Sequence, residues 1–216
     1  KGINKVLVVT DGGLMRLHLL DPMFAKLDEC GVEYVVYDGV QPNPSIENIE
    51  EAREMFVSNG CEAMIAFGGG SPMDCAKAAG ARVMNPNQTV SQMRGELKIR
   101  HKLPPFFAVP TTAGTGSETT LAAVVTNMQT HEKYAINDPK LRPKYAVLDP
   151  ELTTGLPQKI TSTTGMDALT HAVEAYIGLS GTKSTDDYAE RATKLIFENL
   201  ETAYNDGKNL QARENM

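Results

Sequence analysis

Four short runs of β-branched and aromatic residues limit most strongly what this chain can fold into. They are VLVV (6–9), YVVY (34–37), MIAF (64–67) and FFAV (106–109), and segments with helical periodicity lie between them. Continuous apolar runs of this length are typical of strands that are buried on both faces. Strands that alternate with helices form a parallel sheet with right-handed crossovers. The sequence therefore predicts an α/β fold built on a parallel sheet.

Local signals place further elements around these strands. Ser45 is a good N-cap for a predicted helix at 45–59. LAAVVTN (121–127) and KYAIN (133–137) predict a hairpin appended to the sheet, and AVLDP (146–150) predicts a further strand. In the predicted helix at 45–59, the buried stripe is expected to contain Ile46, Ile49, Ala52 and Phe56.

The pattern becomes helical after about residue 154. Periodicity predicts one helix at 165–178 and a longer one near 185–204. We therefore expect an α/β domain over 1–154 and the first helices of an incomplete all-helical domain over 155–216. The predicted buried positions are Met166, Leu169, Val173 and Tyr176 in the first helix, and Tyr188, Ala192, Leu195, Leu200 and Ala203 in the second.

Charge and cysteine content narrow the classes of function. The net charge of −6 argues against a nucleic-acid or anionic-membrane surface. No stretch approaches the roughly 20 apolar residues of a membrane-spanning helix. Cys30, Cys61 and Cys75 are widely spaced, which favours reduced thiols in a cytoplasmic protein. Lys1 leads directly into a strand-like run, so no signal peptide is expected and the natural N-terminus is expected upstream.

A triple-glycine turn is the first candidate binding element. In AMIAFGGGSPMDCAKAAG (63–80), a buried strand leads through the glycines into a helix expected to begin at Ser71 and Pro72. Glycines let the backbone approach a ligand, and free N–H groups at a helix N-terminus bind anions such as a pyrophosphate. The turn could instead serve strand–helix packing alone. Asp74, in the first turns of this helix, is equally suited to cap the helix or to contact a ligand.

A hydroxyl-rich loop follows the next strand, in AVPTTAGTGSETT (108–120). Such a loop offers uncharged donors to a phosphate or a carboxamide. Two loops after neighbouring strands form one crevice at the carboxyl edge of the sheet, which is the usual ligand site of open α/β folds. The hydroxyl side chains are those of Thr111, Thr112, Thr115, Ser117 and Thr119.

Acidic residues end two other strands, Asp11 after VLVVT and Asp38 after YVVY. A carboxylate at such a position accepts hydrogen bonds from an adenosine ribose and repels a 2′-phosphate, which favours NAD over NADP. Asp38 has the usual place of this acid in a dinucleotide-binding fold. Either residue could instead be an ordinary turn residue before a glycine.

The helix in TGMDALTHAVEAY (164–176) carries a second kind of candidate site. Asp167 and His171 are four positions apart, so one turn of helix brings the two side chains together. A carboxylate and an imidazole can converge on a divalent metal. They can equally form a hydrogen bond with each other.

These motifs, in this order, resemble the iron-containing alcohol dehydrogenase family, and the resemblance covers essentially the whole chain. It implies a dinucleotide-binding, dehydroquinate synthase-like domain followed by an all-helical domain. It also implies a metal-dependent, NAD-linked oxidoreductase that interconverts primary alcohols or diols and aldehydes, as lactaldehyde reductases, propanediol dehydrogenases and butanol dehydrogenases do. A homodimer formed through the N-terminal domain is expected by the same analogy.

The resemblance assigns roles to individual residues. Asp167 and His171 match the first two metal ligands, for Fe²⁺ or alternatively Zn²⁺. Asp11, rather than Asp38, matches the acid that disfavours NADP. The remaining matches to cofactor-binding positions are Gly69, Gly70, Ser71, Asp74, Thr111, Thr112, Thr115, Ser117, Thr119, Lys133 and Leu152.

One departure from the family pattern concerns the metal. The family completes its metal site with two histidines further downstream, whereas His18, His101 and His131 all lie upstream of Asp167. We therefore interpret the chain as a piece of a longer enzyme. Two other hypotheses stay open: a non-catalytic nucleotide-binding module, and a relative of glycerol dehydrogenase or dehydroquinate synthase.

Overall fold

The computed structural model describes residues 2–216, which form two compact units. The first, here called the sheet unit, contains the chain up to Pro110 together with Ser117–Val147. The second, the helical unit, contains Thr111–Gly116 together with Leu148–Met216. The short loop Thr111–Gly116 thus belongs to a different unit from the residues on either side of it.

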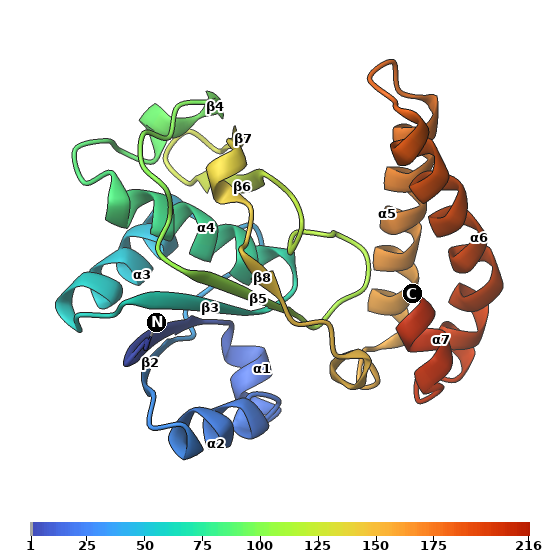
Figure 1. Ribbon diagram of the computed structural model, residues 1–216, viewed down its shortest axis with the longest axis horizontal. Coiled ribbons are helices and arrows are strands. Elements are labelled where there is room, and N and C mark those ends of the chain that lie inside the picture. Colours follow the sequence, from blue (N-terminus) through green and yellow to red (C-terminus); the bar gives the residue numbers. More distant parts are fainter. Residues whose placement is uncertain (1) are drawn as a thin grey trace. The chain divides into compact units, whose positions relative to one another are not determined.

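The sheet unit is built on a five-stranded parallel sheet in the order β2-β1-β3-β5-β8 (Figure 1). All four strands expected from the apolar runs are present, and the predicted fold class is confirmed. The predicted strand at 146–150 is mostly wrong: β8 ends at Ala146, residues 147–149 have no regular structure, and Pro150 begins a 3-10 turn, η3 (Pro150–Thr153). The strands are β1 (Lys5–Val9), β2 (Glu33–Tyr37), β3 (Ala63–Gly68), β5 (Phe106–Pro110) and β8 (Tyr145–Ala146).

Burial differs along the sheet. Every residue of β3 is buried, as are Val6 to Val9 of β1. The expectation of burial on both faces is wrong for β2, where Tyr37 alone is fully buried. The reason is position, since β2 is an edge strand and pairs with β1 on one side only.

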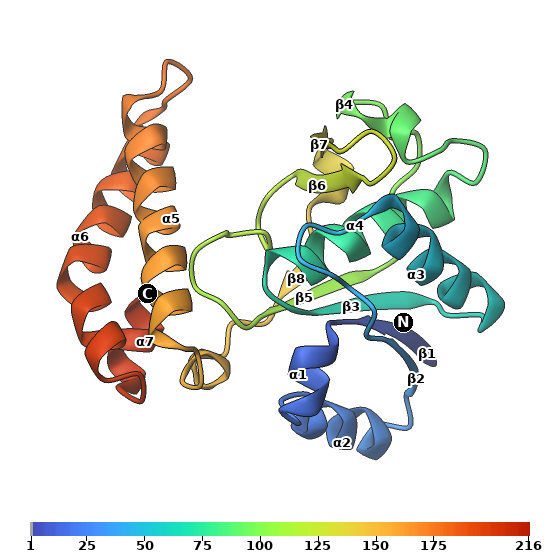
Figure 2. The ribbon, with the colours of Figure 1, turned by 180° about the vertical axis from the view of Figure 1, so that it is seen from behind.

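Helices cover both faces of this sheet: α3 and α4 lie on one face, and α1 and α2 on the other (Figures 1 and 2). Ser45 forms the predicted cap of α3 as a capping box with Asn48. Ile49, Ala52 and Phe56 are buried as expected, whereas Ile46 is half-buried. The helices are α1 (Gly12–Arg16), α2 (Asp21–Glu29), α3 (Ile46–Ser58) and α4 (Gly70–Met84).

The predicted hairpin forms, but it belongs to a second sheet. Strands β6 (Ala122–Asn127) and β7 (Glu132–Asn137) pair antiparallel, and β4 (Gly95–Glu96) adds to β7. The expectation that the hairpin extends the main sheet is wrong, because β8 takes the edge beside β5 and β6 packs against α4 instead. The 3-10 turns η1 (Ser91–Met93) and η2 (Pro139–Leu141) complete this region.

The helical unit consists of α5 (Gln158–Ile177), α6 (Lys183–Asn205), α7 (Leu210–Asn215) and η3. Arg213 fastens α7, because its guanidinium donates to Thr161 Oγ1 and to the Gly207 carbonyl, each at 2.9 Å. α5 begins at Gln158, several residues before the predicted start at residue 165.

The buried stripe of α5 is not the one expected from its apolar residues. Met166, Val173 and Tyr176 are exposed, and Tyr188 on α6 is 70% exposed. Small side chains let the two helices approach, and a Cβ added at Gly165 would lie 2.4 Å from Leu200. The buried residues are Thr161, Gly165 and Ala172 on α5, and Ala189, Ile196 and Ala203 on α6.

Two sequence-level expectations concern the chain as a whole. Cys30, Cys61 and Cys75 are all free thiols, as expected, and the last two are buried. Within residues 2–216, no helix combines the length and the apolar character needed to cross a membrane.

Candidate functional site

The strand order places a candidate site at one edge of the main sheet. From β1 the chain proceeds to β2 on one side, and from there to β3 on the other, so the order reverses between β1 and β3. Ligands of open α/β sheets bind at such a reversal, outside the carboxyl ends of the strands. Asp11 follows β1 there, and the glycine turn follows β3.

The glycine turn has a shape that side chains would obstruct. Gly68 has φ of +146°, and a Cβ at this position would lie 2.7 Å from Pro72 Cγ. α4 begins at Gly70, and its N-cap residue, Gly69, supplies no side-chain cap. The helix therefore starts one residue before the predicted position, and Pro72 is its third residue rather than its first. The uncapped N–H groups of this first turn are free to bind an anion.

Asn43 connects two predicted cofactor-binding residues. Its backbone N–H donates to Ser71 Oγ at 3.2 Å, and its Oδ1 accepts from Lys133 Nζ at 2.7 Å. Asn43 has φ of 57°, in the left-handed region that asparagine tolerates. Sequence reasoning missed this residue. Its place between Pro42 and Pro44 was the available signal.

Asp74 joins α4 to the hydroxyl-rich region rather than capping its own helix. It is the fifth residue of α4, so of its two open roles the capping of this helix does not occur. Its Oδ1 accepts from Ser117 Oγ at 2.8 Å, and its Oδ2 accepts from Val124 N at 3.0 Å. Burial raises the pKa of Asp74, an effect that outweighs the opposing hydrogen bonds and the nearby Lys77 ammonium.

Lys77 is a fully buried cation, one turn further along α4. Its Nζ donates to Ser117 Oγ at 3.0 Å, to Thr120 Oγ1 at 2.9 Å and to the Ala122 carbonyl at 2.9 Å. Burial lowers the pKa of Lys77 to about 8, although Asp74 opposes this shift. Sequence reasoning missed this residue too, and a lysine within the small-residue run CAKAAGA was the signal.

The two candidate acids after β1 and β2 differ in their surroundings. Asp11 is the N-cap of α1, and its Oδ1 accepts from Gly13 N at 2.8 Å and Leu14 N at 3.0 Å. Asp11 therefore has a structural role at this turn, which is independent of any role toward a ligand. Asp38 is exposed.

The predicted hydroxyl loop is divided between the two units. Thr111 is buried, and Thr112 and Thr115 are half-buried in the part that belongs to the helical unit. That part lies against α5, since a Cβ at Gly114 would be 2.3 Å from the Thr164 carbonyl oxygen. Leu152, in η3 of the same unit, is half-buried. In the sheet unit, Ser117 is buried and Thr119 is exposed.

Asp167 and His171 lie together on α5, as their spacing predicts. His171 Nε2 is 3.6 Å from Asp167 Oδ2, and the two side chains are 58% and 47% exposed. Both donor types suit Fe²⁺ or Zn²⁺. Within residues 2–216, no cluster of three or more histidine, cysteine or acidic side chains is arranged to hold a metal. The pair therefore fits a metal as two ligands of an incomplete set.

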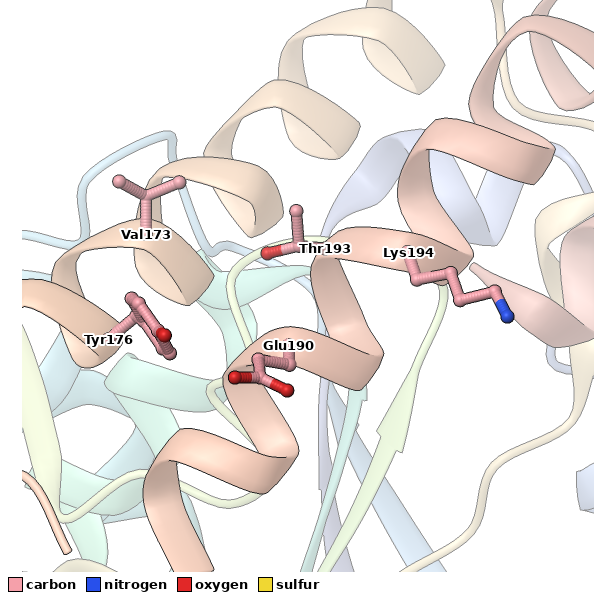
Figure 3. Close-up of a pocket in the computed structure, with 5 residues that line it drawn as sticks. All are labelled: Val173, Tyr176, Glu190, Thr193 and Lys194. Atoms are coloured by element: carbon pink, nitrogen blue, oxygen red, sulfur yellow. The ribbon is translucent and has the colours of Figure 1, made fainter. Parts of the chain in front are cut away.

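A groove between α5 and α6 lies on the same helices. It has a volume of about 360 Å³ and is lined by Val173, Tyr176, Glu190, Thr193 and Lys194 (Figure 3). None of the predicted site residues lines it. We interpret it as helix surface that the described part of the chain does not cover.

Two family models match the chain. Residues 1–150 match the model described as iron-containing alcohol dehydrogenase, and residues 161–216 match the C-terminal model of the Fe-containing alcohol dehydrogenase family. Together they agree with the resemblance drawn from the motifs.

Several known proteins are similar to the chain over its whole length. It is 42% identical to 1,3-propanediol dehydrogenase of Citrobacter freundii, covering 100% of this chain and 56% of the relative. It is 40% identical to alcohol dehydrogenase 4 of Schizosaccharomyces pombe, covering 100% of this chain and 51% of the relative. The chain thus spans about half the length of these relatives.

Solved structures agree with this similarity. The structure of a 1,3-propanediol oxidoreductase matches with a TM-score of 0.96 at 42% identity, over 99% of this chain and 56% of the other. A sulfoacetaldehyde reductase of Bifidobacterium kashiwanohense, solved in complex with NAD⁺, matches with a TM-score of 0.90 at 33% identity, over 99% and 56%. By its family models, its relatives and its fold, the chain belongs to the iron-containing alcohol dehydrogenase family.

Proposed function

We propose that the protein to which this chain belongs is a metal-dependent, NAD-linked oxidoreductase that interconverts primary alcohols or diols and aldehydes. The reaction is hydride transfer between the alcohol carbon and C4 of the nicotinamide, and the substrate is a small molecule. The observation that carries the proposal is the β3–α4 turn, where an uncapped helix N-terminus follows Gly68 at the reversal point of the sheet.

This turn fits a dinucleotide in two respects. The N–H groups of Gly70 and Ser71 stand at the start of a 15-residue helix, whose dipole favours a pyrophosphate. The backbone at Gly68 and Gly69 has no Cβ to keep a phosphate away. We assign pyrophosphate binding to Gly69, Gly70 and Ser71.

The carboxylate of Asp11 supports NAD rather than NADP as the cofactor. Its Oδ1 caps α1, while its Oδ2 makes no hydrogen bond within residues 2–216. We propose that Asp11 accepts a hydrogen bond from the adenosine ribose and repels a 2′-phosphate.

Asp167 and His171 are proposed as two of the metal ligands. A bound Fe²⁺ or Zn²⁺ would supply Lewis acidity toward the substrate oxygen. The side chains themselves provide one carboxylate oxygen and one imidazole nitrogen, exposed and one turn apart on α5.

The test uses the natural full-length protein, titrated with NADH and assayed with 1,3-propanediol and 1-butanol. We expect NADH binding, reversible NAD⁺ reduction, and loss of turnover on treatment with a chelator. Asp167→Asn and His171→Ala should lose bound metal, measured by elemental analysis, and should still bind NADH. Glu174→Gln, an exposed carboxylate on the same helix, is the matched control and should keep its metal.

Two outcomes contradict the proposal in different ways. NADH binding without metal uptake or turnover identifies a non-catalytic nucleotide-binding module, in which Asp167 and His171 form only a structural hydrogen bond. Turnover that survives the chelator removes the metal from the mechanism. A homodimer in the cytoplasm is also proposed, on family resemblance, and a monomer in light scattering at micromolar concentration would contradict it.

A further inference from the structure

The ammonium of Lys77 is the centre of a buried polar cluster inside the sheet unit. Its side chain is 0% exposed, and within residues 2–216 every hydrogen-bond partner of Nζ lies in one short stretch, here called the 117–122 segment. The partners are Ser117 Oγ, Thr120 O, Thr120 Oγ1 and Ala122 O, at 2.9–3.3 Å. An ammonium has three donors, so this set satisfies it completely.

Asp74 reinforces the same attachment from the preceding turn of α4. It accepts from Ser117 Oγ, and its Oδ1 lies 4.0 Å from Lys77 Nζ. Ser117 is thereby held from both sides: it donates to the carboxylate and accepts from the ammonium. Two side chains of one helix face thus fix where the 117–122 segment begins.

The cost of burying this charge argues that it has a purpose beyond stability. Taking an ammonium out of water is expensive, and an apolar residue of similar volume often stabilises such a site as well or better. An ammonium can donate hydrogen bonds to several oxygen atoms and so fix their positions, which an apolar side chain cannot do. Here those oxygens belong to a segment that starts at the predicted cofactor residue Ser117 and includes Thr119.

We propose that Lys77 is a positioning residue for the dinucleotide: through Ser117 and Thr120 it fixes the 117–122 segment against α4, and so holds the segment's polar groups in register with the glycine turn at the start of the same helix. This inference rests on the proposed cofactor site. α4 is then the common support of both cofactor elements, with the glycine turn at its first residue and the segment attached through Asp74 and Lys77.

A second buried cation on α4 provides a matched control. Arg82 is 8% exposed, and it donates to Glu50 and to the carbonyls of Asn85, Pro86 and Gln88. It therefore fastens a different loop, beyond the other end of the helix. Replacing it tests what the loss of any buried cation from α4 does to the protein.

The experiment compares Lys77→Met with Arg82→Met in the full-length protein. Hydrogen exchange by mass spectrometry, without cofactor, reports the protection of residues 117–124. NADH titration reports the dissociation constant, and steady-state assays separate KM for NADH from kcat. For Lys77→Met we expect about tenfold faster exchange in this stretch and about tenfold weaker NADH binding, with kcat changed less than KM. Arg82→Met should leave both within about twofold.

Thr120→Val supplies a second, milder variant in case Lys77→Met does not fold. It removes one acceptor of Lys77, together with the 3.5 Å hydrogen bond that Thr120 Oγ1 donates to the Ser117 carbonyl oxygen, and it replaces no predicted cofactor residue. We expect changes in the same direction, of about threefold.

Exchange or NADH binding that stays within about twofold of wild type in Lys77→Met, or equally large effects in Arg82→Met, would overturn the positioning role. A wild-type protein that does not bind NADH overturns the proposed function instead. The exchange measurement still reports, in that case, whether Lys77 holds the segment.

Discussion

Asp11 combines a structural role with a proposed recognition role, and two substitutions separate them. Asp11→Asn keeps an oxygen that can cap α1 and removes the charge, whereas Asp11→Ala removes both. We expect both variants to bind NADPH about tenfold better relative to NADH, because the repulsion of a 2′-phosphate is lost. Fluorescence titration with both cofactors measures this ratio.

Stability distinguishes the same two variants. The alanine variant should lose about 1 kcal/mol of unfolding free energy with the cap, and the asparagine variant should lose much less. Thermal or urea unfolding measures this difference. A cofactor preference unchanged in Asp11→Asn would show that this carboxylate has no part in specificity, and would favour Asp38 for that role.

The lowered pKa of Lys77 predicts a pH dependence of stability. In the unfolded chain a lysine has its usual pKa of 10.5, whereas the pKa of Lys77 in the folded protein is about 8. Between these values the unfolded chain binds more protons than the folded protein, so the contribution of Lys77 to stability increases as pH rises. Below about pH 8 the contribution is lowest and constant.

The measurement is the difference in unfolding free energy between wild type and Lys77→Met. We expect it to change in favour of wild type by roughly 3 kcal/mol between pH 7.5 and 10.5. Subtraction cancels the opposing effect of Cys61 and Cys75, whose pKa values are raised by burial. Parallel curves for the two proteins would show that Lys77 titrates normally.

The sequence predicted those residue contacts that form between near neighbours along the chain. The Ser45 cap and the Asp167–His171 pair depend on neighbours within one helical turn, so their spacing predicted that they come together. Asn43 and Lys77 were missed because their partners are distant, up to 90 positions away for Asn43 and 45 for Lys77. Contacts at such separations follow from the fold and carry no periodic signal.

The loop Thr111–Gly116 meets α5 through a glycine, which makes Gly114 a point of contact between two elements. A Cβ there would lie 2.3 Å from the Thr164 carbonyl oxygen and 2.6 Å from Thr164 Cβ. Because backbone cannot move aside cheaply, Gly114→Ala should displace the loop and cost about 1–3 kcal/mol of unfolding free energy. NADH binding should weaken as well, given the proposed role of Thr111, Thr112 and Thr115.

Gly155→Ala is the control for this substitution. A Cβ at Gly155 meets nothing within 4 Å, so the change should be neutral or slightly stabilising. Chemical denaturation and hydrogen exchange of the loop measure both variants. Equal stability of the two would show that the loop adapts without cost.

The helices and strands themselves were predicted better than the way in which they pair and pack. The apolar runs of strands and the periodicity of helices depend on consecutive residues alone. Accordingly, β1, β3, β5 and α3 appear where the pattern predicts them. The partner of a strand depends on competition, and β8 occupies the edge that the β6–β7 hairpin was expected to take. The buried face of α5 is likewise the one that carries its small residues. Gly165 lets α6 approach more closely than the larger apolar side chains of α5 would.

At the scale of the whole chain, several large apolar side chains of the helical unit are exposed. The exposed side chains include Met166, Val173 and Tyr176 of α5 and Phe197 of α6. Exposed apolar patches mark surfaces that normally contact other protein. We expect the 216-residue chain, produced alone, to bind the dye ANS and to associate as its concentration rises.

A charged variant checks this expectation. Tyr176→Glu combined with Phe197→Glu should lower the ANS fluorescence and the apparent mass in light scattering. Both residues are exposed, at 53% and 74%, so the fold should tolerate the change. A wild-type chain that stays monomeric and gives no ANS fluorescence would show that these side chains do not form an interaction surface.

The attachment of the 117–122 segment to α4 has a practical consequence for chimeric enzymes. A designer who wishes to change coenzyme preference would naturally transplant a relative's glycine turn together with its helix. Asp74 and Lys77 would travel with that insert, but the oxygen atoms they meet would stay behind in the recipient. The smallest exchangeable module is therefore discontinuous in sequence, and it pairs residues 68–84 with residues 117–124.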